Sequence, residues 1–374
     1  LMLPYFSEKF GNESSVHTVG QEAKFALDNA REMVASCLNS RVGDVIFTSG
    51  GTESDNAALI GAAMALKETG NHIITSAVEH HAVLHACQYL ENMGFQITYL
   101  PVDDAGKIDL SQLSKAITGQ TVLVSLMYAN NEIGTINPIA EISELVKKRA
   151  SEFQRTIVMH CDAVQAAGFL TLDTKALGVD MLSLSGHKFY GPKGTGILYL
   201  RRGTPFLPIL FGGSQERERR PGTENVAGAV GLSEALNIAD SSRVQTSNHC
   251  MLLRNTLIKE ITEKIPGSVL NGSLENRLAN NVNFSFEGVQ GESILLGLDM
   301  AEISASSGSA CSSGSLEPSH VLLALGQSSE LARGSLRMTL GKFNTESEIE
   351  YVLEVLPKLV QELRGLPTLS SSGI

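Results

Sequence analysis

The sequence contains no tryptophan, and only 5% of its residues are aromatic. Cysteine is also scarce: Cys37, Cys87, Cys161, Cys250 and Cys311 are an odd number, are widely scattered and include no Cys-x-x-Cys pair. This usage argues against a disulfide framework and for a reducing compartment. No apolar run approaches the roughly 20 residues that a membrane-spanning helix needs, so we expect no membrane partner.

Basic residues are outnumbered by acidic ones. The 29 Lys and Arg against 40 Asp and Glu give a net charge of −11, with no long basic run, which disfavours nucleic acid as a partner. The chain starts at Leu1 without an initiator methionine or a basic segment, so we expect no signal peptide and a start inside a longer chain. We therefore expect a cytoplasmic protein, or one of the mitochondrial matrix if the source is eukaryotic.

The 374 residues, 43% of them hydrophobic, suffice for a large core and two domains. Strand-like and helix-like segments alternate up to about Leu200, which predicts an α/β fold with a mostly parallel sheet covered on both faces. We expect seven strands, at Val45–Thr48, His72–Ser76, Gln96–Pro101, Thr121–Met127, Thr156–Cys161, Val179–Leu184 and Gly196–Arg201. After about Asp240, helical patterns flank two further strands, so we predict a large domain over residues 1–244 and a smaller α+β domain over residues 245–374.

The segment Ser185-Gly186-His187-Lys188 follows one of these apolar strands and leads into a Gly- and Pro-rich turn. A lysine held there in a buried position would lose its proton readily and could attack an aldehyde. Ser185 and His187 could hold an anion beside it. An aldehyde and a phosphate together indicate pyridoxal phosphate, although a solvated lysine in a surface turn is the alternative.

Other predicted strands also end in polar residues, where ligands of such sheets bind. Gly50, Gly51 and Thr52 lead into a helix that we expect at Glu53–Lys67, and the N–H groups and dipole at its start favour anions. Asn131 follows the central strand, and Asp162 follows the next one, where a carboxylate could pair with a protonated ring nitrogen. Each of these residues could instead only cap a turn or helix.

Three histidines follow the second strand. His80, at the strand end, is placed to lie against a flat cofactor. His81 and His85 are spaced to share one helix face, which permits a zinc pair and hence a zinc hydrolase, but the segment is not His-Glu-x-x-His and a third ligand is needed.

In combination, these residues resemble the fold-type-I pyridoxal-phosphate enzymes of class V. The resemblance becomes close with Ser306-Ser307-Gly308-Ser309-Ala310-Cys311 followed by Leu316-Glu317-Pro318-Ser319. That pattern is similar to the group I cysteine desulfurases, which supply sulfur for iron–sulfur clusters, and the likeness runs from Phe10 to about Thr345.

The resemblance implies a role for each matched residue. The cofactor would be held by Gly51, Thr52, Ser185 and His187 at the phosphate, Asp162 at the ring nitrogen, Gln165 at the ring hydroxyl, His80 stacked on the ring and Lys188 bound covalently. Asn131 and Arg337 would hold the carboxylate of L-cysteine. Lys188 would move the proton at Cα, His80 would relay protons, and Cys311 would take the sulfur as a persulfide.

The same resemblance implies partners. Thr223 would reach the phosphate of the other subunit in a homodimer, and a sulfur acceptor or cluster scaffold protein would receive the sulfur. No metal site is expected beyond a transient iron–sulfur contact through Cys311. The other four cysteines fit a role as small buried hydrophobes.

Some features depart from the family or leave alternatives open. The family's first strand would precede Leu1, and Ser312-Ser313-Gly314 stands where relatives usually carry Thr-Ser-Ala. Residues 211–225 also resemble selenocysteine lyases, so that activity is an alternative, as is a scaffold protein that keeps the fold without the catalysis. The Ser- and Gly-rich segment around Cys311 favours the desulfurase, because sulfur must travel to an acceptor.

Overall fold

The computed structural model describes residues 1–307 and 317–365, and the chain divides into two compact units. The first unit comprises Leu1–Pro101, Ile108–Ala129 and Asn137–Val244. The second comprises Gln245–Ile374 together with two short segments from the first half of the chain, Val102–Lys107 and Asn130–Ile136. Asn131 therefore belongs to the same unit as Arg337.

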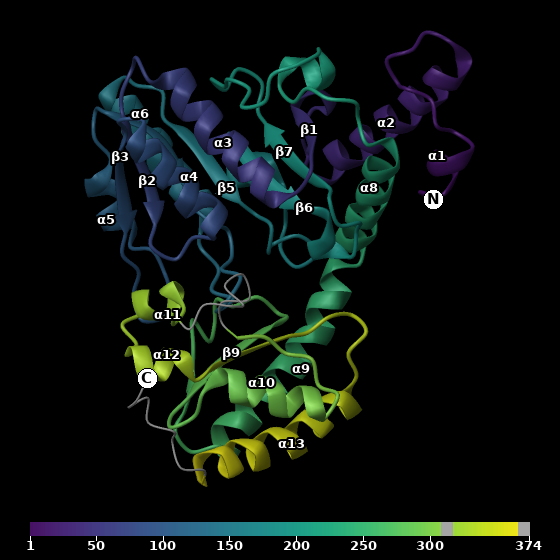
Figure 1. Ribbon diagram of the computed structural model, residues 1–374. Coiled ribbons are helices and arrows are strands. Elements are labelled where there is room, and N and C mark those ends of the chain that lie inside the picture. Colours follow the sequence, from purple (N-terminus) through teal and green to yellow (C-terminus); the bar gives the residue numbers. More distant parts are fainter. Residues whose placement is uncertain (308–316, 366–374) are drawn as a thin grey trace, which may run out of the picture. The chain divides into compact units, whose positions relative to one another are not determined.

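A seven-stranded sheet forms the centre of the first unit, in the order β1-β7-β6-β5-β4-β2-β3 (Figure 1). Its strands are β1 (Val45–Thr48), β2 (His72–Ser76), β3 (Gln96–Leu100), β4 (Thr121–Ser125), β5 (Val158–Asp162), β6 (Met181–Ser185) and β7 (Gly196–Leu200). Neighbouring strands from β3 to β6 are parallel, and β7 is antiparallel to both β6 and β1. The predicted α/β fold with a large, mostly parallel sheet is confirmed.

Helices cover this sheet, and its strands other than the edge strand β3 are buried along almost their whole length. The helices of this unit are α1 (Pro4–Ser7), α2 (Thr18–Cys37), α3 (Gly51–Leu66), α4 (His81–Asn92), α5 (Leu110–Ala116), α6 (Ile139–Phe153), α7 (Thr174–Leu177) and α8 (Val226–Ser241). Helix α3 runs across one face of the sheet (Figure 1), where the small side chains of Ala58, Ala62 and Ala63 lie in a common core with Val158 of β5. Helices α2 and α8 pack on each other.

Strand alternation decides which polar side chains meet α3. Since successive side chains point to opposite faces, His160 and Asp162 share the face of Val158. The Nε2 atom of His160 lies 3.6 Å from Oδ1 of Asp55, a residue of the first turns of α3. The start of α3 thus covers the polar end of β5.

The second unit contains a three-stranded antiparallel sheet in the order β10-β9-β8, with strands β8 (Ser268–Leu270), β9 (Asn281–Phe286) and β10 (Ser335–Thr339). Its helices are α9 (Arg243–Lys264), α10 (Gly291–Met300), α11 (His320–Ala324), α12 (Ser329–Arg333) and α13 (Glu346–Gly365). Arg337 of β10 stands opposite Asn283 of β9. In both units, no helix among residues 1–307 and 317–365 has the length and apolar character needed to cross a membrane.

Candidate active site

A close approach of α3 to β6 forms the first part of the site. A Cβ atom at Gly51 would lie 2.8 Å from Cγ2 of Val164 and 3.5 Å from Cβ of Ser185, so a larger residue would push these neighbours away. Gly50, at the N-cap, has no side chain that could cap α3. The first N–H groups of α3 are therefore available to an anion near Ser185.

Ser185 and His187 form a polar pair at this position. The Oγ atom of Ser185 lies 3.0 Å from Nδ1 of His187. Partial burial, followed by the positive charges of Lys188 and Lys193, lowers the pKa of His187, which favours a neutral ring at pH 7. While this hydrogen bond is in place, the neutral pair can offer a phosphate one donor, which is either the Nε2–H of His187 or the hydroxyl of Ser185, depending on the His187 tautomer.

Lys188 lies on a short 3₁₀ helix, Gly186–Phe189, directly after β6. Gly186 and Phe189 are buried, with Phe189 only 1% exposed, whereas Lys188 itself is exposed. The expectation of a buried lysine was therefore wrong for the single chain. The physical reason is the tight turn: it directs Phe189 into the core and the two residues before it outward.

The carboxyl group of Asp162 lies at the end of the neighbouring strand β5. It is 6% exposed, and Oδ1 accepts a hydrogen bond of 2.9 Å from the N–H of Val164. Burial raises the pKa of Asp162 to about 6, although the Val164 hydrogen bond and the positive charge of Lys188 act in the opposite direction. Asp162 and Lys188 are therefore close enough to interact electrostatically.

Two further buried acids and a histidine lie behind Asp162, and the sequence analysis missed them. The His160 ring lies 2.8 Å from Oγ of Ser125 and 3.0 Å from Oγ of Ser183, and burial lowers its pKa to about 3. Burial also raises the pKa of Glu79 to about 8 and that of Asp55 well above its ordinary value, and Asp162 adds to both effects.

These pKa shifts separate the buried groups that are neutral at pH 7 from the one that ionises. His160, Asp55 and Glu79 are neutral at pH 7, so Asp162 is the member of this group that ionises near neutral pH. No motif marks these residues, since Asp55 sits within a helix and His160 within a strand. A polar His160 between apolar residues of a strand that is buried along its whole length is the signal that could have drawn attention to it.

Three other predicted cofactor residues border these elements. His80 is the N-cap of α4, where its Nδ1 accepts a hydrogen bond of 3.1 Å from the N–H of Ala82, and it is half-buried. Gln165 is half-buried three residues after Asp162, and Thr52 is exposed in the first turn of α3. The rings of His81 and His85 lie 5.1 Å apart, but residues 1–307 and 317–365 contain no group of three His, Cys, Asp or Glu suited to a metal ion, so the zinc alternative finds no third ligand.

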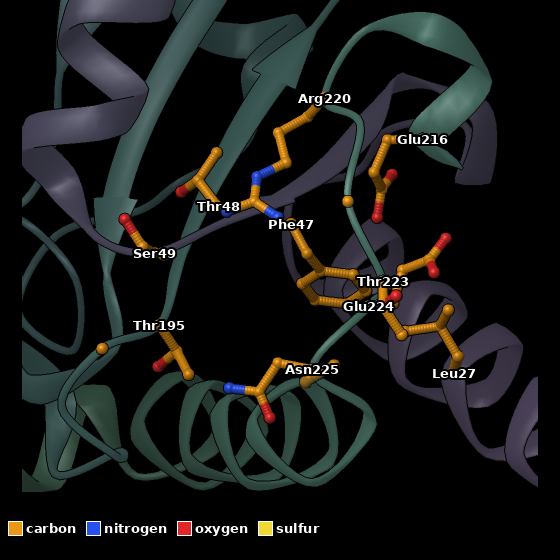
Figure 2. Close-up of a pocket in the computed structure, with 14 residues that line it drawn as sticks. Leu27, Phe47, Thr48, Ser49, Thr195, Glu216, Arg220, Thr223, Glu224 and Asn225 are labelled. Atoms are coloured by element: carbon orange, nitrogen blue, oxygen red, sulfur yellow. The ribbon is translucent and has the colours of Figure 1, made fainter. Parts of the chain in front are cut away.

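Thr223 lines a different part of the first unit. It lines a cavity of about 270 Å³. Figure 2 shows it there together with Thr48, Ser49, Thr195 and Arg220. Thr223 is exposed, whereas Arg220 is held by Glu53 through a hydrogen bond of 2.8 Å from its Nε atom. The lining of this cavity does not include Ser185 or His187.

The second unit brings Asn131 and Arg337 together. The Nη1 atom of Arg337 donates a hydrogen bond of 2.9 Å to the backbone carbonyl of Asn131. Cys311, the predicted nucleophile, lies outside the described residues.

The remaining four cysteines are described. Cys87, Cys161 and Cys250 are buried, and Cys37 is half-buried. Burial raises the pKa of every one of these thiols, to about 11 for Cys37 and about 12 for Cys87. They remain protonated at neutral pH and are weak nucleophiles.

Comparison with known proteins decides the family. Residues 1–352 match the family described as Aminotransferase class-V. The chain belongs to this family. The class-V relatives include the cysteine desulfurase IscS of Dictyoglomus turgidum, which is 50% identical over 365 residues, covering 98% of this chain and 91% of the relative. The cysteine desulfurase IscS of Methanosarcina thermophila is 51% identical over 370 residues, covering 99% of this chain and 90% of the relative.

Solved structures agree. A NifS-like protein superimposes with a TM-score of 0.90 at 37% identity, covering 97% of this chain and 94% of that one. The protein SspA, solved in complex with cysteine, gives a TM-score of 0.78 at 34% identity, covering 92% of this chain and 94% of that one. The predicted resemblance to class-V enzymes and cysteine desulfurases is confirmed.

Class-V aminotransferases depend on pyridoxal 5′-phosphate, and the described residues fit this cofactor. The uncapped start of α3 beside Ser185 and His187 suits a phosphate. The buried Asp162 carboxyl, which would be costly to ionise without a cationic partner, suits a protonated ring nitrogen. Lys188 supplies an exposed amine within the electrostatic reach of that carboxyl.

Proposed function

We propose that this chain is an L-cysteine desulfurase, which converts L-cysteine to L-alanine and leaves the sulfur as a persulfide on Cys311. The observation that carries the proposal is that the buried Asp162 carboxyl lies within electrostatic reach of Lys188, at the ends of neighbouring strands, in a class-V chain. The names of the relatives identify the reaction among the many that this family performs.

In this proposal, the phosphate of the cofactor is held by the backbone of Gly51, the side chain of Thr52 and the Ser185–His187 pair. Asp162 binds the ring nitrogen, while Gln165 binds the ring hydroxyl and His80 lies against the ring. When bound, the cofactor draws electrons from the Cα atom of the substrate, which makes the Cα proton removable.

Lys188 takes and returns protons at Cα. Its exposure suits this role, because an amine at the surface of the unit can reach a substrate that arrives from solvent. The ionised Asp162 keeps the ring nitrogen cationic, while Asp55 and Glu79 retain their protons and do not compete with it for that charge. His80 relays protons near the substrate sulfur.

Arg337 binds the substrate carboxylate with its guanidinium group, assisted by Asn131. The hydrogen bond from Nη1 of Arg337 to the Asn131 carbonyl fixes the position of the guanidinium group relative to Asn131. The Cys311 thiolate then attacks the substrate sulfur: an S–S bond forms, the C–S bond breaks, and the carbon keeps the bonding electrons and takes up a proton to give alanine.

Two observations support Cys311 as the sulfur carrier. The four described cysteines have raised pKa values through burial and make poor nucleophiles. Cys311 lies instead in a run of Ser, Gly and Ala. We further propose that a sulfur acceptor, such as a cluster scaffold protein, receives the persulfide sulfur in a reducing compartment.

A homodimer is part of the proposal. Thr223 is exposed and lines a cavity whose lining does not include Ser185 or His187. An exposed threonine of this kind is available to the cofactor of a second copy, as the family resemblance implies.

A cysteine-dependent assay of alanine, sulfide and protein persulfide on the full-length protein tests the proposal. Lys188→Ala should lose the absorbance of covalently bound cofactor and all turnover. Cys311→Ser should keep that absorbance but form no persulfide, whereas the control Cys37→Ser should behave as wild type. Persulfide on the Cys311→Ser protein would show that another cysteine is the carrier.

Two outcomes would replace the proposed function. Turnover of selenocysteine without turnover of cysteine would identify a selenocysteine lyase. Protein that stays colourless after addition of pyridoxal phosphate would identify a scaffold that has lost the catalysis.

A further inference from the structure

Glu132 is a buried acid of the second unit that the proposed reaction does not use. It is 3% exposed. The turn around it is fixed, because Oδ1 of Asn130 accepts hydrogen bonds from the N–H groups of Glu132 (2.8 Å) and Ile133 (3.0 Å). The Glu132 carbonyl accepts two more, of 2.9 Å each, from the side-chain amides of Asn281 and Asn283 of β9. This backbone holds the Glu132 side chain inside the unit.

The Glu132 carboxyl has a directed hydrogen-bond donor. The Ser319 hydroxyl donates to Oε2 of Glu132 at 2.5 Å. The same Ser319 oxygen accepts from the N–H groups of Val321 (3.2 Å) and Leu322 (3.3 Å) at the start of α11, so its proton is left to point at Glu132.

Arg337 is the cation that acts on this carboxyl. Burial raises the pKa of Glu132 to about 7, while the Ser319 hydrogen bond and the positive charge of Arg337 act against that rise. Arg337 also donates to the carbonyl of Asn131, the residue before Glu132. The guanidinium that should receive the substrate carboxylate thus already acts electrostatically on Glu132 and is hydrogen-bonded to the residue before it.

Other charged and titratable groups around Glu132 come from each packed element. Behind β9, Nη1 of Arg277 donates to Oδ1 of Asn281 at 2.9 Å, which places its charge on the side of the Glu132 carbonyl. Glu317 and His320 flank Ser319 in the sequence. Among the causes that set the pKa of the carboxyl, only burial, Ser319 and Arg337 are significant.

We propose that Glu132 is a positioning residue that takes up a proton when an α-carboxylate binds to Arg337. The proposal rests on the proposed function, in which Arg337 binds the carboxylate of the substrate. An arriving carboxylate offsets the positive charge of Arg337 that Glu132 experiences, and two carboxylates near one guanidinium in a poorly solvated place repel each other. Protonation of Glu132 removes this repulsion and leaves Arg337 to the substrate.

The sign of the pH dependence follows by linkage. The bound ligand raises the pKa of Glu132 above its value of about 7 in the free protein. Affinity for a carboxylate ligand is therefore constant below about pH 7 and falls as the pH rises through the free-protein pKa. It levels off only above the pKa of the complex. At pH 7 the free carboxyl is about half protonated, so binding takes up at most about half a proton.

Calorimetric titration of the full-length holoenzyme with L-alanine, the proposed product, tests this idea because alanine carries the carboxylate and no thiol. Titrations in two buffers of different ionisation enthalpy give the number of protons taken up. The ammonium group of alanine and the cofactor also exchange protons on binding, and they do so equally in wild type and in Glu132→Gln, which keeps the shape and an acceptor for Ser319. Relative to this variant, the wild type should take up an additional fraction of a proton at pH 7 to 7.5 and should lose affinity by up to about tenfold per pH unit above pH 7.

Controls keep the inference separate from the proposed function. Glu330→Gln removes an exposed carboxylate from the same unit and should keep the wild-type profile. Arg337→Ala should bind alanine weakly at every pH. If Glu132→Gln keeps the wild-type proton uptake while Arg337→Ala loses binding and the wild type turns over cysteine, the inference is overturned and the function stands.

A second variant covers the case in which Glu132→Gln does not fold. Ser319→Ala removes the hydrogen bond that lowers the pKa of Glu132, so the fall in affinity should begin at a higher pH than in the wild type. An unchanged onset would overturn the proposal, because a purely structural Glu132 predicts no such displacement.

Discussion

Replacing Asp162 by asparagine should stabilise the cofactor-free protein while damaging the site. The pKa of Asp162 is raised from 3.8 to about 6, chiefly by burial. A raised carboxyl pKa means that the folded state binds the proton more tightly than the unfolded state. Its contribution therefore favours folding at low pH and is lost as the pH rises from about 4 to about 6.

The size of the effect follows from that difference. At about 1.4 kcal/mol per tenfold change in proton affinity, ionising Asp162 costs the folded protein about 3 kcal/mol above pH 6. Asparagine avoids this cost and can still accept the hydrogen bond from Val164. The variant also lacks the repulsion that Asp162 exerts on Asp55 and Glu79, and this loss stabilises the folded protein as well.

Thermal unfolding of cofactor-free wild type and Asp162→Asn at pH 4 and pH 8 measures the difference. The variant should melt about 4 °C above wild type at pH 8, because about 3 kcal/mol is spread over the large unfolding entropy of 374 residues, and the two should converge at pH 4. Pyridoxal phosphate should raise the melting temperature of wild type more than that of the variant. An Asp162→Asn protein that melts at or below wild type at pH 8 would refute the reasoning.

Two further predictions concern packing and a buried ion pair. Gly51→Ala should weaken the binding of pyridoxal phosphate in a spectroscopic titration, since the new Cβ would lie 2.8 Å from Val164 and must displace it or α3; unchanged affinity would contradict the close approach. Glu216→Gln should cost about 3–5 kcal/mol in thermal unfolding, because it leaves buried Arg31 without the carboxylate that it contacts at 2.6 and 2.9 Å. Glu354→Gln, in an ion pair whose side chains are 67% exposed, is the matched control and should cost under about 1 kcal/mol.

The sheet of the first unit could be predicted from the sequence because its strands are apolar and short. Predicted strands Val45–Thr48 and His72–Ser76 have the observed bounds, and the other strand ends differ by one or two residues. Helix α8, Val226–Ser241, was not predicted. Its first half, Val226–Leu232, contains only apolar residues and glycine, so this part of the sequence has no polar face to reveal a helical period.

The polar residues at strand ends could be predicted because the turn chemistry is local. The N-terminal glycines of α3, the Ser185–His187 pair and the position of Asp162 all follow from residues next to each other in the sequence. The neutral Glu79 and the Glu132–Ser319 hydrogen bond could not be predicted, since their partners are brought together only by tertiary packing. The burial of Lys188 was misjudged because neighbouring apolar residues say little about which side chain of a tight turn faces inward.

The two early segments that belong to the second unit make that unit inseparable from the chain that precedes it. Thr135 pairs with Arg277, Leu278 donates its N–H to the Gly134 carbonyl, and the Ser273 N–H binds Oγ of Thr135. A fragment that starts at Gln245 would lose all of these partners. We therefore expect truncated proteins and chimeras that are cut between Val244 and Gln245 to fail to fold. A chimera that exchanges the C-terminal third must also exchange residues 102–107 and 130–136.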